Sequence, residues 1–535
     1  TEPAGVFLIG LDPPHERIPV RVRTTTPEIT GDYALEITPL VPMQPRTGYA
    51  FGVTRAVSGA DGRPLQPGPA FRSMLCDGIE SATAAAWRER LAGVRSLLEA
   101  EDGVGCDDLV LLDFLTTQST TTDLESIREL FDSGRLPLPE PDFTSTAFPS
   151  LKTGIFPAGT PEFEEALRGL LSIGGAPAGE SLGAIAIGTF RTYEFRGPSR
   201  AFVAERVSGA VTPPATEIAF YMAFPAAPPP PGGYPVVLYG HGLSRSGADA
   251  LSMAGVFPEL PMVWAGISAV SHGERGSFLG FFNFNNVLAT RDNFRQTVAD
   301  MLLFQRMLRH SGHPLFADFD RDRFRFYGIS LGGIIGALYL GIENQIDVAM
   351  LSVPGGGLPN ILAGSDVIGE LLKPLVSLSL AMPVEDPFFP VTFDRFIQLA
   401  QWVLDPGDPI NTAPYLIGTR TLAGLPPKRV LMQMGVEDTI VPNRTSEDLA
   451  RAAGFADLRA AGGCRSDDGC SGLWRFDMSA YDRPVDCGHG IAFVLPEANR
   501  QSIRYLFNGG TEVEDASPRL SSDERPLCPT LEVGG

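Results

Sequence analysis

The stretch Phe324–Gly336 narrows the possible folds of this chain more than any other. It reads FRFYGISLGGIIG: a short apolar and aromatic run, the motif Gly-x-Ser-x-Gly around Ser330, then small and aliphatic residues at helical spacing. This succession predicts a buried strand, a sharp turn and a helix. Side chains at Gly328 and Gly332 would collide with neighbouring backbone. The turn would hold the Ser330 hydroxyl at a helix N-terminus, which favours developing negative charge, so Ser330 is the candidate nucleophile.

A second apolar strand is predicted at 234–239 (YPVVLY), and it runs directly into the small residues GHGL at 240–243. Small residues let such a loop fold over a nucleophile, so that its backbone N–H groups face the substrate oxygen. We expect one N–H of this oxyanion hole to come from Leu331, directly after the candidate nucleophile. The second is expected from Leu243, with Ser244 as the alternative.

Two further turns supply an acid and a base. The strand Arg429–Met434 is followed by GVEDTIVP, which places Asp438 on the turn beyond the strand, with the adjacent Glu437 as an alternative. His489 lies on a glycine-flanked loop, DCGHG, and is the only one of the six histidines that follows Asp438. The order serine, acid, histidine is that of α/β-hydrolases. In a triad, His489 would act as general base, and Asp438 would fix the imidazole tautomer.

Several residues near these turns are candidates for contact with a substrate. After the predicted strand Val263–Val270 comes SHGERG, and then an aromatic cluster made of Phe278, Phe281, Phe282 and Phe284. These rings either line the entrance for an acyl group or pack beneath a cap, and the histidines at 241 and 272 either line the pocket or serve a structural role. The candidate substrate-binding residues are His241, Gly242, His272, Phe281 and Phe282.

Composition and the absence of other motifs exclude several functions. A net charge of −21 argues against nucleic acid as a partner, because phosphate backbones require clustered Lys and Arg. A hydrophobic fraction of 44% and a charged fraction of 20% indicate an ordinary globular protein, and no apolar run is long enough to cross a membrane. There is no HExxH, paired-carboxylate, P-loop or GxGxxG pattern, so no metal and no cofactor is expected.

The six cysteines indicate disulfides. The loop CRSDDGC has the wrong ligand spacing for zinc and no histidine nearby, so a small disulfide fits it better. The expected pairs are Cys464–Cys470, Cys76–Cys106 and Cys487–Cys528. Such pairs favour a secreted or cell-surface location, and the alternative is six free thiols in a cytosolic enzyme. The sequence starts at Thr1 without Met, and a signal segment is expected outside it.

The chain is expected to contain three parts. Residues 1–120 are β-rich with a helical segment, and the pattern of 39–67 is similar to bacterial Ig-like modules. Residues 121–180 are expected to form a linker or a wrapping segment, rich in Pro, Thr, Ser and Gly. Residues 181–535 are expected to form an α/β catalytic domain, with a helical insertion at about 357–425. An insertion there is either a cap that moves over the site or a static helical layer.

The chain resembles bacterial extracellular lipases and esterases of the virulence-factor lipase type. The resemblance rests on YPVVLYGHGLSRSG, SHGERG, LATRDNFRQTVAD, YGISLGG, LDPGDPI and GVEDTIVP, and covers most of 215–510. It implies an Ig-like N-terminal module ahead of an α/β-hydrolase domain. It also implies hydrolysis of carboxylic esters, including acyl lipids, by a secreted or surface-attached enzyme that associates with a lipid surface.

These observations favour a serine carboxylic-ester hydrolase that forms an acyl-enzyme on Ser330, with a hydrophobic acyl chain as substrate and no cofactor. A polyester depolymerase would use the same residues in a more open cleft. A serine peptidase of the same fold and a non-catalytic surface-binding protein remain as alternatives from other classes.

Overall fold

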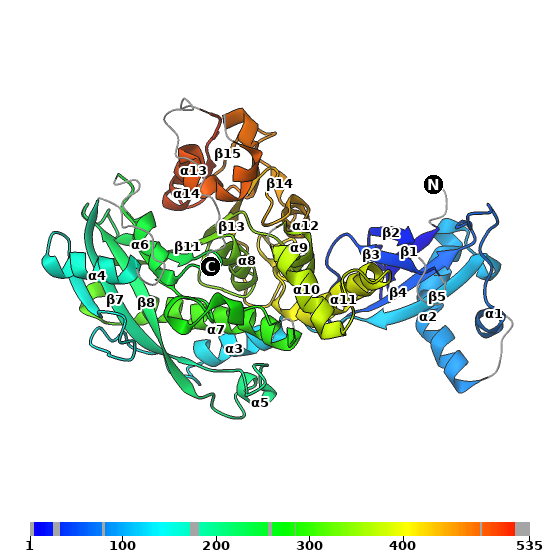
Figure 1. The fold of residues 1–535 in the computed structure, drawn as a ribbon. Helices are drawn as coiled ribbons and strands as arrows, with labels where there is room; N and C mark the ends of the chain where they lie inside the picture. The colour runs from blue at the N-terminus through cyan, green and yellow to red at the C-terminus, as the bar shows by residue number, and fades with distance from the viewer. Residues whose placement is uncertain are drawn as a thin grey trace. The chain divides into compact units, whose positions relative to one another are not determined.

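A computed structural model describes residues 5–24, 33–76, 81–171, 181–254, 259–283, 285–366, 368–481 and 484–518. The chain divides into two compact units, Thr1–Thr120 and Thr121–Gly535 (Figure 1). Within the described ranges, no helix is both long enough and apolar enough to cross a membrane.

The larger unit is built on a ten-stranded sheet. Every pair of neighbouring strands from β14 to β10 is parallel, and the remaining pairs, β10–β8, β8–β7 and β7–β6, are antiparallel. The strands in their order across the sheet are β14 (Ala456–Asp457), β16 (Gly472–Phe476), β13 (Arg429–Gly435), β12 (Val348–Ser352), β11 (Phe319–Ile329), β9 (Tyr234–Gly240), β10 (Val263–Ile267), β8 (Ala215–Pro225), β7 (Leu182–Tyr193) and β6 (Gly154–Pro157).

Helices cover both faces of this sheet, which explains the nearly continuous apolar runs of its central strands. Because side chains alternate along a strand, Val236 and Leu238 of β9 enter one core, while Val237 and Tyr239 enter the other. The first core is completed by α3 (Thr122–Asp132), α7 (Val287–His310), α8 (Leu331–Leu340) and α12 (Asn443–Ala453). The second is completed by α4 (Pro161–Leu171), α6 (Ala250–Met253), α13 (Ile491–Val494) and α14 (Pro496–Phe507).

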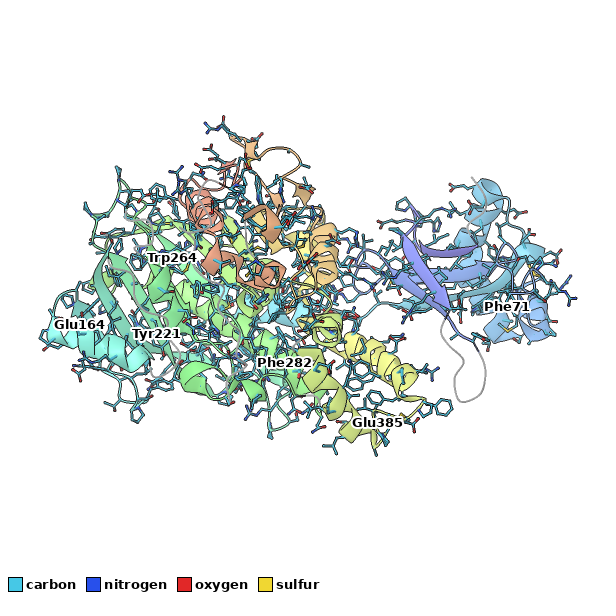
Figure 2. All side chains as sticks on the ribbon, turned by 45° about the horizontal axis from the view of Figure 1, so that its top comes forward. Phe71, Glu164, Tyr221, Trp264, Phe282 and Glu385 are labelled. Atoms are coloured by element: carbon cyan, nitrogen blue, oxygen red, sulfur yellow. A yellow bond between two sulfur atoms is a disulfide. The ribbon has the colours of Figure 1, made fainter. Side chains whose placement is uncertain are left out.

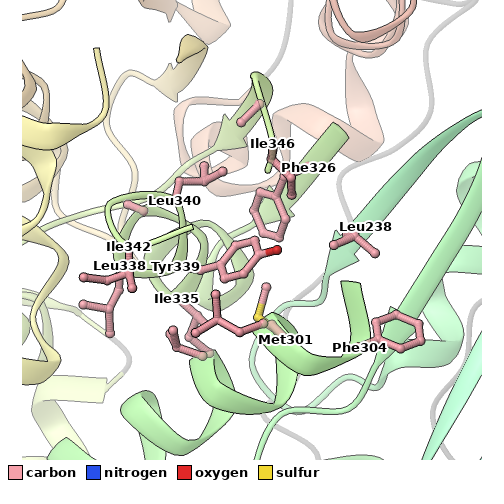
Figure 3. Packing of buried hydrophobic residues seen from close by; sticks show 14 of the residues in the cluster. Leu238, Met301, Phe304, Phe326, Ile335, Leu338, Tyr339, Leu340, Ile342 and Ile346 are labelled. Atoms are coloured by element: carbon pink, nitrogen blue, oxygen red, sulfur yellow. The ribbon is translucent and has the colours of Figure 1, made fainter. Parts of the chain in front are cut away.

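The two cores are densely filled with large side chains. Figure 3 shows part of the first core, where Phe304 of α7, Phe326 of β11 and Tyr339 of α8 are buried. Tyr221 and Trp264, labelled in Figure 2, belong to the second core and are almost completely buried. A mostly parallel sheet between two helical layers confirms the predicted α/β class.

The segment 121–180, expected as a linker or a wrapping segment, belongs to the larger unit over its described part. Helix α3 places Leu124, Ile127 and Phe131 in the first core, and β6 is an edge strand of the sheet. The Arg128 guanidinium also donates a hydrogen bond of 2.6 Å to the carbonyl oxygen of Ile342. These contacts make the segment part of the sheet and of its core.

The smaller unit contains an antiparallel sheet of β1 (Val6–Gly10), β4 (Gly48–Thr54) and β5 (Leu109–Thr116), in that order. Helix α2 (Ala82–Asp102) packs against this sheet through Leu91, Val94 and Leu98. The strands β2 (Val20–Thr24) and β3 (Leu35–Pro39) form a separate pair. An Ig-like module has two sheets packed face to face. In the smaller unit, the helix α2 packs on the three-stranded sheet. This arrangement does not confirm an Ig-like module, and the Ig-like assignment stays a prediction.

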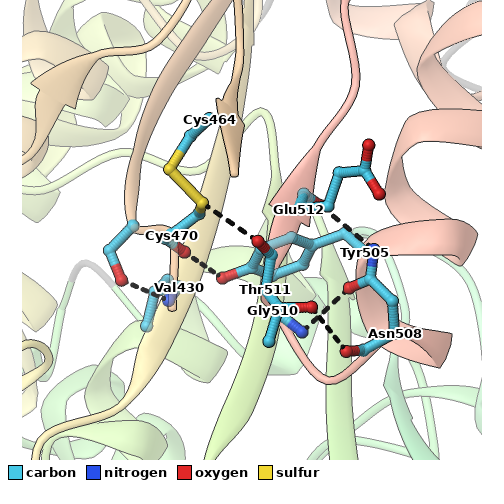
Figure 4. Close-up of a disulfide and its surroundings, with 9 residues drawn as sticks. Val430, Cys464, Cys470, Tyr505, Asn508, Gly510, Thr511 and Glu512 are labelled. Atoms are coloured by element: carbon cyan, nitrogen blue, oxygen red, sulfur yellow. Dashed lines mark hydrogen bonds between the residues drawn. A yellow bond between two sulfur atoms is a disulfide. The ribbon is translucent and has the colours of Figure 1, made fainter. Parts of the chain in front are cut away.

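Two of the three expected disulfides lie within the described residues. Cys76 is joined to Cys106, and Cys464 is joined to Cys470. Around the second pair, the hydroxyl of Tyr505 donates a hydrogen bond of 2.6 Å to the carbonyl oxygen of Cys470, which ties the disulfide loop to α14 (Figure 4). Cys528 lies outside the described residues, so its pairing with Cys487 stays a prediction.

Candidate active site

Ser330 occupies the sharp turn between β11 and α8. Its φ of 53° and ψ of −119° are unfavourable for a residue with a side chain, and strain of this kind persists only where the surrounding structure imposes it. The backbone N–H of Ser330 donates to the carbonyl oxygen of Ser352, at 2.9 Å. A Cβ atom at Gly332 would lie against the carbonyl group of Gly240. The glycine therefore allows the loop after β9 to approach the serine turn, as in the nucleophile turn of an α/β-hydrolase fold.

The structure brings Ser330, His489 and Asp438 into one chain of hydrogen bonds. The Ser330 hydroxyl lies 2.9 Å from Nε2 of His489. On the other side of the ring, Nδ1 lies 2.8 Å from Oδ2 and 3.0 Å from Oδ1 of Asp438. Because a carboxylate only accepts hydrogen bonds, Nδ1 carries the proton and Nε2 is free to accept the serine proton. All three side chains are buried.

Asp438, rather than its neighbour Glu437, faces the histidine. The backbone N–H groups of Ile440 and Val441 each donate to Oδ1 of Asp438, at 2.9 Å. The side chain of Glu437 is exposed. A Cβ atom at Gly435 would overlap the carbonyl oxygen of Gly488, so the glycines at the end of β13 and before His489 let the two loops meet.

The loop after β9 lies close to Ser330. A Cβ atom at Gly242 would be only 3.9 Å from the Cβ of Ser330. The carbonyl oxygen of Gly242 accepts hydrogen bonds from Nδ1 of His241, at 2.8 Å, and from the N–H of Arg245, at 3.2 Å. These bonds fix the orientation of the peptide group that carries the Leu243 N–H. The N–H of Leu331, at the first position of α8, has no acceptor inside the helix.

His241 is held as a neutral ring. Its Nδ1 donates to the carbonyl oxygen of Gly242, and its Nε2 accepts a hydrogen bond of 2.9 Å from the backbone N–H of Ala269. A second proton, on Nε2, would point at the backbone N–H of Ala269 and replace this hydrogen bond by repulsion. Burial lowers the pKa of His241 from 6.5 to about 4. His241 therefore joins the loop after β9 to the end of β10 and is positioned to orient the Gly242–Leu243 peptide.

His272 lies beside His241, with ring centroids 5.2 Å apart. Its Nδ1 donates to the carbonyl oxygen of Val270 at 2.9 Å, and its buried Nε2 has no partner among the residues that the structure describes. Burial, followed by repulsion from His241, lowers the pKa of His272 to about 3.

The two buried histidines predict a loss of stability in mild acid. Because both folded-state pKa values lie below 6.5, the unfolded chain binds protons first as the pH falls through 6.5. At pH 5 each histidine lowers the free energy of unfolding by about 2 kcal/mol relative to pH 8. Urea unfolding across this range measures the loss. His272→Asn keeps a donor for the Val270 carbonyl oxygen and is expected to remove about half of this loss of stability. An unchanged pH dependence in this variant would show that the burial of His272 does not destabilise the fold in acid.

An apolar pocket opens beside the serine. It is lined by Leu243, Phe282, Phe294, Ser330, Leu331, Ile334, Leu358, Ile361, Leu362, Ile368, Ile440 and Val441. Of the candidate substrate-binding residues, Phe282 (labelled in Figure 2) belongs to this lining. Gly242 lies next to the serine. His241, His272 and Phe281 are not in the lining: they are buried, and Phe281 packs on His272 and Phe294. Phe284 lies outside the described residues.

Helix α9 (Leu358–Gly364) supplies three pocket residues that the sequence analysis did not single out. Leu358, Ile361 and Leu362 recur at helical spacing and face the pocket together. The only available signal was the amphipathic stretch LPNILAG at the start of the 357–425 segment. That the apolar side of this helix faces the pocket at Ser330 depends on contacts between segments far apart in the sequence.

Asp408 anchors this helix. Its carboxylate is completely buried and accepts hydrogen bonds from the N–H groups of Gly357 (2.9 Å), Leu358 (2.6 Å) and Ile410 (3.0 Å), and from the Gln401 side chain (2.9 Å). Burial raises the pKa of Asp408, although these donors counteract the shift. The side chain therefore joins the start of α9 to the end of α11 (Phe389–Leu404).

Asp408→Asn is expected to lower the free energy of unfolding by about 3 kcal/mol, because an amide N–H would face backbone N–H donors in a buried site. Urea unfolding measures this loss. Glu385→Gln removes an exposed carboxylate from the same segment and serves as the control. Equal stability of the two variants would show that Asp408 does not anchor the helix.

No group of three or more His, Cys, Asp and Glu side chains suited to a metal ion occurs in the part of the chain that the structure describes.

No protein-family model matches the chain, and no curated protein sequence matches it. Among solved structures, an acetyl xylan esterase from Paenibacillus sp. R4 is similar, with 13% identity and a TM-score of 0.38 over 67% of this chain and 88% of its own. The 2,6-dihydroxy-pseudo-oxynicotine hydrolase has 12% identity and a TM-score of 0.35 over 59% and 74%. An acylaminoacyl peptidase from Pyrococcus horikoshii has 11% identity and a TM-score of 0.33 over 55% and 40%.

Proposed function

We propose that this protein is a serine hydrolase of carboxylic esters. The observation that carries the proposal is the hydrogen-bond chain from Ser330 through His489 to Asp438, with 2.9 Å and 2.8 Å at its two links. A serine hydroxyl is a weak nucleophile by itself, and a neutral imidazole within hydrogen-bond distance activates it. The strained turn, which presents the hydroxyl beside an apolar pocket, supports the same role.

The geometry supports the following sequence of steps. Nε2 of His489 takes the proton as Ser330 Oγ attacks the ester carbonyl carbon, and Asp438 stabilises the imidazolium. The negative charge on the carbonyl oxygen is stabilised by the N–H groups of Leu331 and Leu243. His489 then returns the proton to the leaving alcohol, which leaves an acyl group on Ser330. Water, deprotonated by His489, attacks this acyl group. The bond between the acyl carbon and Ser330 Oγ then breaks, His489 returns the proton to Oγ, and the acid is released. The steps require no cofactor.

The proposed substrate is an ester with a hydrophobic acyl group, because aliphatic and aromatic side chains surround the serine in the pocket. Helices α9, α10 (Ile368–Leu380) and α11 are proposed as the cap over this site, since α9 supplies part of its wall. The two disulfides support a secreted or cell-surface location, where thiols are oxidised.

Hydrolysis of p-nitrophenyl esters, compared with peptide p-nitroanilides, tests this function. An ester hydrolase is expected to release p-nitrophenol from acyl esters at rates far above background and to leave the anilides almost intact. Preferential cleavage of the anilides would instead identify a peptidase with the same triad. Failure to hydrolyse both the esters and the anilides would contradict the proposed hydrolase function.

A further inference from the structure

Arg275, in the loop after β10, is a largely buried cation that none of the steps proposed above uses. Its side chain is 11% exposed, and its Nη2 group donates a hydrogen bond of 2.8 Å to Oδ2 of Asp300 on α7. Asp300 is completely buried, and its Oδ1 accepts hydrogen bonds from Thr192 Oγ1 at 2.8 Å and from Gln296 Nε2 at 2.9 Å. The carboxylate, fixed by these donors, holds the guanidinium in one position.

The second arm of the guanidinium reaches the peptide group that follows β10. Nη1 of Arg275 donates a hydrogen bond of 2.9 Å to the carbonyl oxygen of Ser268. This carbonyl belongs to the same peptide group as the N–H of Ala269, which donates a hydrogen bond of 2.9 Å to Nε2 of His241. Because a peptide group is conjugated, a donor on its oxygen polarises its N–H and strengthens the bond that this N–H donates. The charge of Arg275 therefore affects His241 through one peptide group.

His241 extends this effect to the loop after β9. Its Nδ1 donates a hydrogen bond of 2.8 Å to the carbonyl oxygen of Gly242, and that carbonyl shares a peptide group with the N–H of Leu243. Three hydrogen bonds of 2.9, 2.9 and 2.8 Å thus form one series from Arg275 to the Gly242–Leu243 peptide, and all three donate in the same direction. Aligned hydrogen bonds polarise one another, so this series makes the Leu243 N–H a stronger donor.

The series requires a neutral imidazole, which accepts a hydrogen bond at Nε2 and donates one at Nδ1. Burial, together with the weaker effect of the Arg245 and Arg275 charges, lowers the pKa of His241 to about 4. The ring is therefore neutral near pH 7, and the series of hydrogen bonds is complete under the conditions in which esterases are assayed.

We propose that Arg275 is a positioning residue for the reaction: held by Asp300, it orients and strengthens the Leu243 N–H that receives the ester oxygen. This inference rests on the proposed function, in which that N–H stabilises the charge on the carbonyl oxygen. The oxygen becomes negative only as Ser330 attacks, so a polarised donor stabilises the transition state more than the bound ester. Arg275 should therefore affect kcat and not KM.

Arg275→Gln tests the proposal, because it removes the charge at the start of the series and leaves the proposed triad unchanged. Loss of a whole oxyanion donor lowers kcat by about a hundredfold to a thousandfold, so a weakened donor should lower kcat for p-nitrophenyl butyrate by about tenfold. KM should stay nearly the same. Propyl trifluoromethyl ketone forms a hemiketal oxyanion on a reactive serine, and its affinity should fall by a similar factor.

Arg291→Gln is the matched control, since it also takes a largely buried guanidinium away from a completely buried carboxylate. Arg291 is 19% exposed and donates to both carboxylate oxygens of Asp292, at 2.8 and 2.9 Å. This variant should keep its kcat and its affinity for the ketone. Equal losses in the two variants, or no loss in Arg275→Gln, would overturn the role of Arg275 and leave the ester hydrolase intact.

A second test introduces Arg275→Gln into a chain that already carries His241→Leu. The leucine removes both hydrogen bonds of the ring, which interrupts the series between Arg275 and Leu243. Adding Arg275→Gln should then lower kcat by less than about twofold more, because both substitutions remove the same effect. A further loss of about tenfold would show that Arg275 does not act through His241 and would overturn the proposal.

Arg275→Lys decides the question if Arg275→Gln fails to fold because Asp300 loses its cation. The ammonium group remains charged beside Asp300, but it is a point charge and does not span two acceptors as the guanidinium fork does. We expect kcat and the affinity for the ketone to fall by about threefold, with KM unchanged. Unchanged values would overturn the role of Arg275, whereas inactivity of the unmodified chain on every ester would overturn both proposals.

Discussion

Replacing Ser330 by alanine is expected to lower kcat/KM for p-nitrophenyl butyrate by about five orders of magnitude. The loss is this large because no acyl-enzyme can form without the hydroxyl, and the oxyanion N–H groups alone provide only the residual catalysis. Since Ser330 lies at a turn that already strains a side-chain-bearing residue, and alanine removes a single oxygen, the fold should be retained. The measurement is initial-rate kinetics, with thermal unfolding as a check on the fold.

Ser352→Ala is the matched control for this substitution. Ser352 lies in the neighbouring strand β12, and its backbone carbonyl accepts the Ser330 N–H. Its own hydroxyl is buried without a partner among the described residues, so its removal should change activity only a few-fold. If Ser330→Ala kept more than about a tenth of the activity, the acyl-enzyme mechanism would be wrong.

Asp438→Asn is expected to reduce kcat by about ten-thousandfold. An asparagine can present an N–H to Nδ1 of His489, which would place the imidazole proton on Nε2, where the Ser330 proton must go. The backbone N–H groups of Ile440 and Val441 both donate to one carboxylate oxygen of Asp438, so the substitution is also expected to weaken this turn. The kinetics are measured with the same esters.

Glu437→Gln separates this effect from a general loss of negative charge at the turn. The two residues are adjacent, but the side chain of Glu437 is exposed, whereas that of Asp438 is buried against His489. The glutamine variant should retain nearly full activity. A similar loss in both variants would show that charge at the turn, and not the orientation of the histidine, supports the activity.

The sequence carries most of the information about Ser330, Asp438 and His489 because each lies in a short local motif. Ser330 and Asp438 follow strands directly, and His489 lies between two glycines in a short 3-10 helix, Val485–Gly490. In the folded chain, β11 and β13 are parallel to their neighbours, so their carboxyl ends meet at one edge of the sheet. The order of the residues along the chain therefore predicts a meeting that the structure shows with distances of 2.8–2.9 Å.

The walls of the pocket could not be predicted in the same way. His272 and Phe281 follow a core strand, as substrate-contacting residues often do, but both are buried, and Phe281 packs against His272 and Phe294. Whether a ring after a strand faces a pocket or the core depends on the helix that covers it, here α7. The contribution of α9 to the pocket depends in turn on Asp408, which fixes the start of that helix from 50 residues further along the chain.

The composition of 121–180 predicts a linker or a wrapping segment, but it does not predict which core the segment joins. In the structure, α3 places Leu124 and Ile127 in the first core of the larger unit. Composition reports on the local backbone, whereas burial is decided by long-range packing.

Treating the unmodified chain with a fluorophosphonate and measuring its intact mass, followed by peptide mapping, tests whether Ser330 is a nucleophile activated by His489. The test requires no choice of substrate. We predict one phosphonyl group per chain, attached to Ser330, and greatly slowed labelling in His489→Ala. Labelling of a different serine, or equal labelling rates with and without His489, would contradict this role of Ser330.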